Sequence, residues 1–345
     1  MKKKGMAIGI AIFIIFIVFV LYISIRHNLF LKVGNKITSL KEMYESSEEY
    51  LYRHENLHLC DSIPSLTDEQ NAWYTNYHFI SHSGGGIDGK FYTNSKQAWD
   101  LSYERGNRLF DADLAFTSDN ILVLRHRWDD NLEQNIPMLE SNTRSIDDNG
   151  QMRYLESSST KMDYSTFINT KIYKKYDAMS CIDMLNFMEK HPDVYVMCDM
   201  KDDLYASYKW LVEVAVETGL EDVLDRIVVS IYHYENLETI NNIYHFDNVM
   251  LRQFTSYPHR YIDIIRFCEA NNVHAVNVSA SFINDEGITQ LANHNIHIYV
   301  AVCDYISDMQ VYSNLGIDGA VTNYLYEDDW KYISDPSRIK EAEAK

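Results

Sequence analysis

From about residue 77 onward, short apolar runs alternate with longer amphipathic segments. Apolar runs of this length are typical of strands that are buried on both faces, and amphipathic segments are typical of helices that cover a sheet. The pattern predicts strands at Phe79–His82, Arg108–Ala115, Val194–Met200, Ile227–Tyr232, Val249–Arg252, Ala275–Val278, His297–Val302 and Gly319–Thr322. It predicts helices at Ser95–Arg105, Cys181–His191, Tyr205–Thr218, Leu237–Tyr244, Pro258–Asn271, Asp285–His294 and Ser307–Leu315.

This alternation of strands and helices indicates an α/β fold with a parallel sheet. Eight strands, mostly in strand–helix units over about 250 residues, fit a closed (β/α)8 TIM barrel. An open doubly wound sheet is the alternative. Asn284 and Ser307 are predicted N-caps, because their side chains can accept backbone N–H groups. The polar stretch at 127–178 interrupts the pattern and predicts a functional lid or a mobile insertion.

The N-terminal end has a different pattern. Met6–Ile25 is almost wholly apolar, and about 20 such residues span the hydrocarbon core of a bilayer. Lysines at positions 2–4 favour an N-terminus in the cytoplasm. A small-x-small cleavage site is absent, which disfavours the alternative of a cleaved signal peptide. We expect a single-pass signal anchor in the cell membrane, with the rest of the chain outside the cytoplasm.

The predicted organisation is therefore a cytoplasmic N-terminus (1–5), a transmembrane anchor (6–25), a juxtamembrane stalk or linker (26–76), a barrel (77–330) and a C-terminal tail (331–345). The formal net charge of −19 over 345 residues argues against nucleic acid or an anionic lipid surface as the main partner. The membrane is then a partner through the N-terminal helix alone.

Ionisable residues within the predicted strands indicate the chemistry. Asp111 and Asp113 are two residues apart, so their side chains point the same way along a strand. Two adjacent carboxylates are unfavourable unless a cation lies between them. Asp199 and Lys201 repeat this spacing in another strand. The three carboxylates suit a divalent cation such as Ca²⁺ or Mg²⁺.

Two histidines follow predicted strand segments. His82 ends the first strand, and His126 follows the apolar extension that ends at Leu124. Imidazoles suit general acid and base roles near neutral pH, and Lys201 suits developing charge on a phosphate oxygen. The set predicts a phosphodiester cleavage site. Each residue taken singly also has a structural alternative. A lone His82 before glycines would be a turn residue, and a lone aspartate beside Lys201 would form a buried salt bridge.

These residues lie in motifs that resemble the glycerophosphodiester phosphodiesterase family, in the wider superfamily of phosphatidylinositol-specific phospholipase C-like barrels. The resemblance runs from about Phe79 to Tyr324. The motifs are His82-Ser83-Gly84, Tyr92-Thr93-Asn94-Ser95, Asp111-Ala-Asp113 with Thr117-Ser-Asp119-Asn120, His126-Arg127, Asp199-Met-Lys201 and Gly316-Ile-Asp318-Gly319-Ala-Val-Thr322-Asn323. The resemblance implies a barrel hydrolase in which Asp111, Asp113 and Asp199 hold the cation and His82 and His126 act as acid and base. The substrate would be a small-molecule or lipid-derived glycerophosphodiester, cleaved to an alcohol and a glycerol phosphate.

Several positions depart from the family pattern. Ser83 replaces an arginine that would contact phosphate. Asp111 and Asp199 each replace a glutamate, and Asn323 replaces an aspartate near the end of the motif series. Arg127 replaces an aspartate and would restore the lost positive charge if it turned inward. These departures keep two alternatives open. One is a non-catalytic barrel that acts as an extracytoplasmic binding or assembly module, and the other is a lyase that stops at a cyclic phosphate.

Overall fold

The computed structural model describes residues 66–67, 72–128, 161–253 and 260–335, together with the backbone of 144–146 and 152–154. The chain divides between Asp61 and Ser62, and all described residues belong to the second unit. The predicted anchor at 6–25 lies outside them. Within the described part, no helix is both long and apolar enough to span a bilayer.

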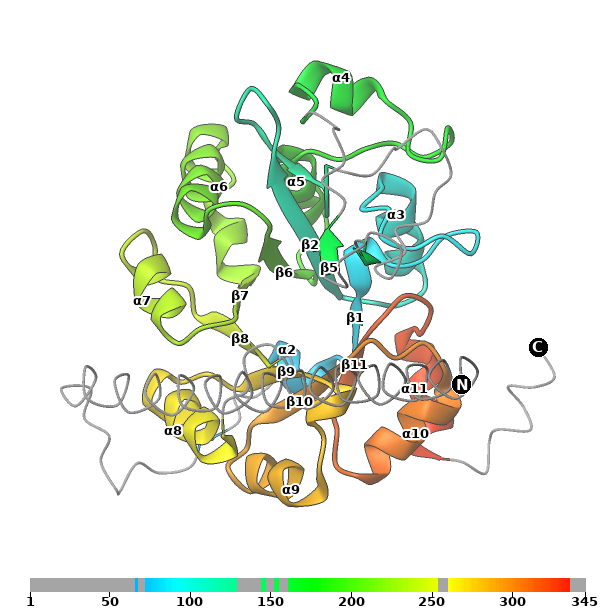
Figure 1. The fold of residues 1–345 in the computed structure, drawn as a ribbon, viewed down its shortest axis with the longest axis vertical. Helices are drawn as coiled ribbons and strands as arrows, with labels where there is room; N and C mark the ends of the chain where they lie inside the picture. The colour runs from blue at the N-terminus through cyan, green and yellow to red at the C-terminus, as the bar shows by residue number, and fades with distance from the viewer. Residues whose placement is uncertain are drawn as a thin grey trace, which may run out of the picture. The chain divides into compact units, whose positions relative to one another are not determined.

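Eight parallel strands form a closed barrel (Figure 1). They are β1 (Phe79–Ser81), β2 (Leu109–Phe116), β6 (Tyr195–Met200), β7 (Ile227–Ile231), β8 (Asn248–Gln253), β9 (Ala275–Ser279), β10 (His297–Ala301) and β11 (Gly319–Thr322). β1 pairs with β11 on one side and with β2 on the other, which closes the ring. The (β/α)8 prediction is confirmed for this part of the chain, and the open-sheet alternative is wrong.

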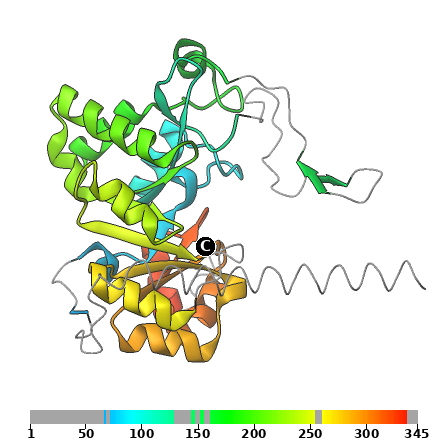
Figure 2. The same cartoon turned by 60° about the vertical axis from the view of Figure 1, so that its left-hand side comes forward.

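Helices surround the strands (Figures 1 and 2). The seven that the sequence predicts are α3 (Lys96–Glu104), α5 (Cys181–Lys190), α6 (Leu204–Thr218), α7 (Glu235–Asn241), α8 (Tyr261–Asn271), α9 (Asp285–Asn293) and α10 (Ile306–Asn314). Asn284 caps α9 by accepting from the backbone N–H of Gly287. Ser307 is not a cap, because α10 begins one residue earlier, with Tyr305 at the N-cap position.

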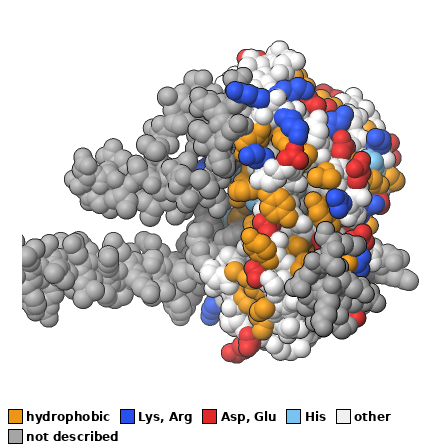
Figure 3. Space-filling view, turned by 90° about the vertical axis from the view of Figure 1, so that its right-hand side faces the viewer, with side chains coloured by type: hydrophobic (Ala, Val, Ile, Leu, Met, Phe, Trp, Pro, Cys, Tyr) orange, Lys and Arg blue, Asp and Glu red, His pale blue; other side chains and the backbone are white. Residues whose placement is uncertain are grey.

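Smaller elements complete the described part. They are α2 (Trp73–Asn76), α4 (Tyr164–Asn169), α11 (Trp330–Ser334), β3 (Leu122–Leu124), the antiparallel pair β4 (Arg144–Ile146) and β5 (Met152–Tyr154), and the 3₁₀ helices η1 (His82–Gly84), η2 (Glu221–Arg226), η3 (Ala280–Phe282) and η4 (Glu327–Asp329). β3 pairs antiparallel with the end of β2. On the face shown in Figure 3, acidic and basic side chains are intermixed among hydrophobic ones, so this face carries charge of both signs.

The last part of the 127–178 stretch packs against the barrel. Phe167 of α4 is fully buried and packs in one cluster with Val123 of β3 and with Ile172, Tyr176 and Ala178. Buried apolar contacts of this kind stabilise a segment against the barrel. Residues 161–178 therefore form a segment with one short helix that packs on the barrel, most of 129–160 lies outside the described residues, and a functional lid stays a prediction.

The barrel interior is built in layers, because alternate residues of each strand point inward. One apolar residue from each barrel strand contributes to the layer near the amino ends: Ile80, Leu109, Met197, Val228, Met250, Ala275, Tyr299 and Val321. Trp73 and Tyr74 of α2 pack against the same layer. This end of the barrel is a hydrophobic core.

Two residues further along each strand, the inward positions become mostly polar. They are His82, Asp111, Asp199, Ser230, Arg252, Asn277, Ala301 and Asn323. Buried charged groups are unfavourable unless they are paired. The change from an apolar layer to a polar one places the candidate chemistry at the carboxyl ends of the strands, where barrel enzymes have their active sites.

Candidate active site

The parallel register of β2 and β6 sets two carboxylates side by side. Asp113 is the direct neighbour of Asp199 across the two strands, and both side chains are buried. Lys201, just beyond the end of β6, bridges them: its Nζ lies 2.8 Å from Asp113 Oδ1 and 2.8 Å from Asp199 Oδ2. A buried like-charge pair is thereby stabilised by a shared ammonium group.

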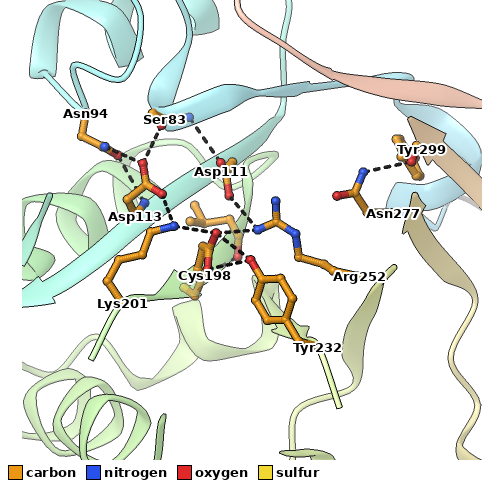
Figure 4. Close-up of polar contacts among 12 residues, drawn as sticks. Ser83, Asn94, Asp111, Asp113, Cys198, Lys201, Tyr232, Arg252, Asn277 and Tyr299 are labelled. Atoms are coloured by element: carbon orange, nitrogen blue, oxygen red, sulfur yellow. Dashed lines mark hydrogen bonds and ion pairs between the residues drawn. The ribbon is translucent and has the colours of Figure 1, made fainter. Parts of the chain in front are cut away.

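A second cation enters the cluster from β8. The Nη1 atom of Arg252 donates to Asp199 Oδ2 at 2.6 Å and lies 3.9 Å from Asp111 Oδ1. The hydroxyl of Tyr232, just after β7, donates to Asp199 at 3.1 Å. Figure 4 shows the guanidinium group of Arg252 between Asp111 and the ring of Tyr232. The cluster thus joins residues from four strand ends.

Neutral donors complete the environment of Asp113. Ser83 Oγ donates to Asp113 Oδ2 at 2.5 Å, and Asn94 Nδ2 donates to the same oxygen at 2.8 Å. The backbone N–H of Ser83 points at Asp111 Oδ2 at 3.4 Å. Ser83 therefore contacts both carboxylates of the Asp111-Ala-Asp113 motif.

The turn that carries Ser83 depends on glycine. Ser83 has a φ of +49°, and the next residue, Gly84, has a φ of +84°. A Cβ atom on Gly84 would lie 2.2 Å from Cδ1 of Trp99 in α3. The glycines after His82 thus allow this turn to pack closely against α3, which holds His82 and Ser83 in place.

The charges in the cluster shift the pKa values of its members in opposite directions. Burial and the neighbouring Asp113 raise the pKa of Asp111 to about 7. Burial also opposes ionisation of Asp113 and Asp199, but Lys201 together with the histidines beside Asp113 and with Arg252 beside Asp199 outweighs it, and the pKa of both carboxyls lies below its usual range. Burial opposes the charge of Lys201, but Asp113 and Asp199 outweigh it and raise the pKa of the ammonium group.

Both candidate histidines contact one aromatic ring. The ring centroid of Tyr92 lies 4.4 Å from that of His82 and 5.0 Å from that of His126. Burial lowers the pKa of His82, and it lowers the pKa of His126 to about 4. Both imidazoles are therefore neutral near pH 7, which is the form that accepts a proton.

Hydrogen bonds assign the tautomer of His82. Asp304 accepts from the backbone N–H of Asn323 at 2.6 Å and from its side-chain Nδ2 at 2.9 Å. This leaves Asn323 Oδ1 facing His82 Nδ1 at 3.1 Å. Because an amide oxygen only accepts, the neutral ring carries its hydrogen on Nδ1, and Nε2 holds the free lone pair.

The three carboxylates can be tested for their fit to a divalent cation. Calcium takes six to eight oxygen ligands. In this arrangement Asp113 and Asp199 direct their oxygens at Lys201, Arg252 and neutral donors, and only Asp111 Oδ1 lacks a hydrogen-bond partner within the described residues. No group of three or more His, Cys, Asp or Glu side chains in this part of the chain is disposed to hold a metal ion. The arrangement as it stands does not fit the predicted cation.

The structure places all six candidate residues at the same end of the barrel. His82 and His126 meet at Tyr92, while Asp111, Asp113, Asp199 and Lys201 belong to the charged cluster. Sequence reasoning missed Arg252, which it placed only as the last residue of a strand. Arg252 follows the buried Met250 by two residues and so points inward, a direction that becomes clear once Met250 is known to be buried.

No family model matches the sequence, and no curated protein matches it either. Solved structures do share its fold. A glycerophosphodiester phosphodiesterase from Parabacteroides distasonis is 12% identical with a TM-score of 0.55, over 76% of this chain and 99% of that one. A phosphodiesterase from Oleispira antarctica, in complex with the product sn-glycerol-3-phosphate, is 13% identical with a TM-score of 0.53, over 76% and 96%. A glycerophosphodiester phosphodiesterase from Thermotoga maritima is 13% identical with a TM-score of 0.51, over 72% and 95%.

Proposed function

We propose that the protein is a phosphodiesterase that hydrolyses glycerophosphodiesters at the carboxyl end of the barrel. The observation that carries the proposal is the pair of imidazoles that contact Tyr92, His82 buried and His126 half-buried, next to the Lys201 cluster. Cleavage of a phosphodiester requires proton transfer at the attacking and leaving oxygens, with positive charge near the phosphoryl group. The names of the solved structures with this fold, and the glycerol phosphate product in one of them, support the same reaction class.

The two histidines divide the proton transfers. His82 Nε2 removes the proton of the attacking oxygen, which belongs to water or to a neighbouring glycerol hydroxyl. The new P–O bond forms as the bond to the leaving alcohol breaks, and His126 returns a proton to the leaving oxygen. His126 must be protonated for this step. An anionic phosphate beside it would raise its pKa, because an opposite charge favours the charged form.

We also propose where the reaction takes place. The apolar segment at 6–25 would anchor the barrel outside the cytoplasm, which brings phospholipid headgroups and glycerol-phosphate polymers of the envelope within reach. The divalent cation at Asp111, Asp113 and Asp199 stays a prediction from the sequence, and none of the proton transfers above depends on it.

The test is turnover by the full-length protein. Glycerophosphocholine and bis(nitrophenyl) phosphate would be incubated with the protein in Ca²⁺, in Mg²⁺ and in chelator, beside the His82→Ala variant. We expect hydrolysis that the variant loses while its circular dichroism spectrum is unchanged. Failure of the folded protein to turn over either substrate in any condition would favour the binding-module alternative.

A further inference from the structure

The polar layer of the barrel contains one cation that the proposed proton transfers do not use. Arg252 is 5% exposed, and its Nη1 atom contacts Asp199 Oδ2 at 2.6 Å. The ring of Tyr232 lies 5.3 Å from the centre of the guanidinium group. A guanidinium group this deeply buried is costly to desolvate, and pairing alone is weak evidence for a stabilising role. A role in ligand binding accounts better for its position.

We propose that Arg252 and Lys201 together bind the phosphate group of the substrate, and that this binding needs no divalent cation. The inference rests on the proposed function, because it assigns the residues that hold the anionic part of that substrate. It also goes beyond the sequence motifs, since none of them includes Arg252.

The first argument is the geometry of the two cations. Lys201 Nζ and Arg252 Nη1 lie 2.8 Å and 2.6 Å from the same oxygen, Oδ2 of Asp199. Their nitrogen atoms are therefore close neighbours that face a common acceptor. A phosphodiester presents two non-bridging oxygens, which one ammonium and one guanidinium group can bind together.

The second argument is charge replacement. Ser83 stands where the resembled family has a phosphate-binding arginine, and its side chain contacts Asp113 instead. Arg252 reaches Asp111 and Asp199 from β8, with Nη1 at 3.9 Å from Asp111 Oδ1. Figure 4 shows Ser83 and Arg252 on opposite sides of Asp111. The guanidinium group is thus present at the site, although it comes from another strand.

The third argument concerns the place that a divalent cation would occupy. Arg252 and Lys201 already provide positive charge between the carboxylates, through contacts to Asp111, Asp113 and Asp199. A metal ion bound to these oxygens would have to displace the side chains of Arg252 and Lys201 from them. It would still lie close to the positive charges of these two side chains. The fixed cations therefore supply the charge for which the sequence predicted a metal.

The experiment is isothermal titration calorimetry of the full-length protein with sn-glycerol 3-phosphate in chelator, repeated in Ca²⁺ and in Mg²⁺. The variants are Arg252→Met, which keeps the length of the side chain, and Arg252→Lys, which keeps the charge but loses the fork of donors. Arg260→Met is the matched control, because Arg260 is exposed at the start of α8 and pairs with Asp263. Circular dichroism would verify the fold of each variant.

We expect the wild-type protein to bind in chelator with unchanged affinity when metal is added. Arg252→Met should bind about 10- to 100-fold more weakly, the range for hydrogen bonds to charged groups. Arg252→Lys should be intermediate and Arg260→Met unchanged. Binding by Arg252→Met as tight as that of the wild type would overturn the inference, as would wild-type binding that requires Ca²⁺ or Mg²⁺.

Turnover distinguishes this inference from the function it rests on. Hydrolysis that requires metal, with metal-dependent binding, would overturn the inference and leave the proposed function in place. Metal-independent binding that Arg252→Met loses, without any turnover, would support the phosphate site and contradict the proposed hydrolysis. If Arg252→Met does not fold, the affinity of Arg252→Lys in chelator is compared with that of the wild type. Weaker binding by Arg252→Lys would support the inference, and equal binding would overturn it.

Discussion

Replacement of Lys201 by Met is expected to destabilise the barrel strongly at neutral pH. Lys201 Nζ bridges Asp113 and Asp199 at 2.8 Å each, and the Asp113 side chain is 1% exposed. Removal of one partner from a buried ion pair costs about 3–5 kcal/mol, because the other charge is left unpaired. Asp113 keeps its bonds to Ser83 and Asn94, so we expect a loss of about 3 kcal/mol, the lower end of this range.

The loss should depend on pH with a definite sign. The folded-state pKa of Asp113 lies below its unfolded value, which is about 3.9. Its stabilisation is therefore complete well above pH 4 and decreases as the pH falls through the unfolded value toward the folded one. The difference between the wild type and Lys201→Met should also shrink as the pH falls, and it should begin to shrink at a higher pH than this range. Without Lys201, burial raises the pKa of the unpaired carboxyls, and their protonation relieves the unpaired charge of the variant.

The assay is urea unfolding followed by circular dichroism at several pH values. Lys209→Met serves as the control, because Lys209 is an exposed lysine of α6 that pairs with Glu213 one turn away. The control should leave the free energy of unfolding unchanged. Equal unfolding free energies for Lys201→Met and Lys209→Met at neutral pH would refute the reasoning that Lys201 neutralises buried carboxylates.

Three further predictions concern proton transfer, pH and packing. His82→Ala and His126→Ala should each lower kcat by about 10²- to 10⁴-fold, the usual contribution of a general acid or base. Steady-state kinetics would measure this loss. Unchanged rates in either variant would exclude the role assigned to that histidine. Because burial lowers the pKa of the proposed base His82 below its usual value of 6.5, its neutral form should persist as the pH falls through 6.5, and kcat/KM should decline only at lower pH; a decline centred near pH 6.5 would contradict the assignment. Gly319→Ala would place a Cβ atom 2.0 Å from the carbonyl oxygen of His78. Thermal unfolding should therefore show a decrease of about 1–3 kcal/mol in the free energy of unfolding, as for an overpacked core. An unchanged melting temperature would show that β1 and β11 can separate freely.

The barrel could be predicted from the sequence because each strand is a short apolar run buried on both faces. All eight barrel strands and the seven predicted helices are present, with ends that differ by a few residues. The segment around Phe167 was predicted as a lid or mobile insertion because its composition is polar on average. Its few apolar residues nevertheless pack against Val123, and such a contact depends on tertiary position.

The candidate site was predictable where an ionisable residue lies inside an apolar strand, as Asp111, Asp113 and Asp199 do. Arg252 was missed because a charged residue at the end of a strand is usually exposed there. Its inward direction follows only when Met250 is known to belong to the apolar layer. The bond between His82 and Asn323 joins opposite ends of the barrel sequence, and closure of the ring brings these two residues together.

The most direct test of the proposed function is the product formed from a glycerophosphodiester. The full-length protein would be incubated with glycerophosphocholine in chelator and in Ca²⁺, and ³¹P NMR would follow the phosphorus signal. The proposed function predicts conversion of the diester signal to that of a glycerol phosphate monoester, with no conversion by His82→Ala. An unchanged diester signal in both conditions from the folded wild-type protein, or a cyclic phosphate that never opens, would contradict it.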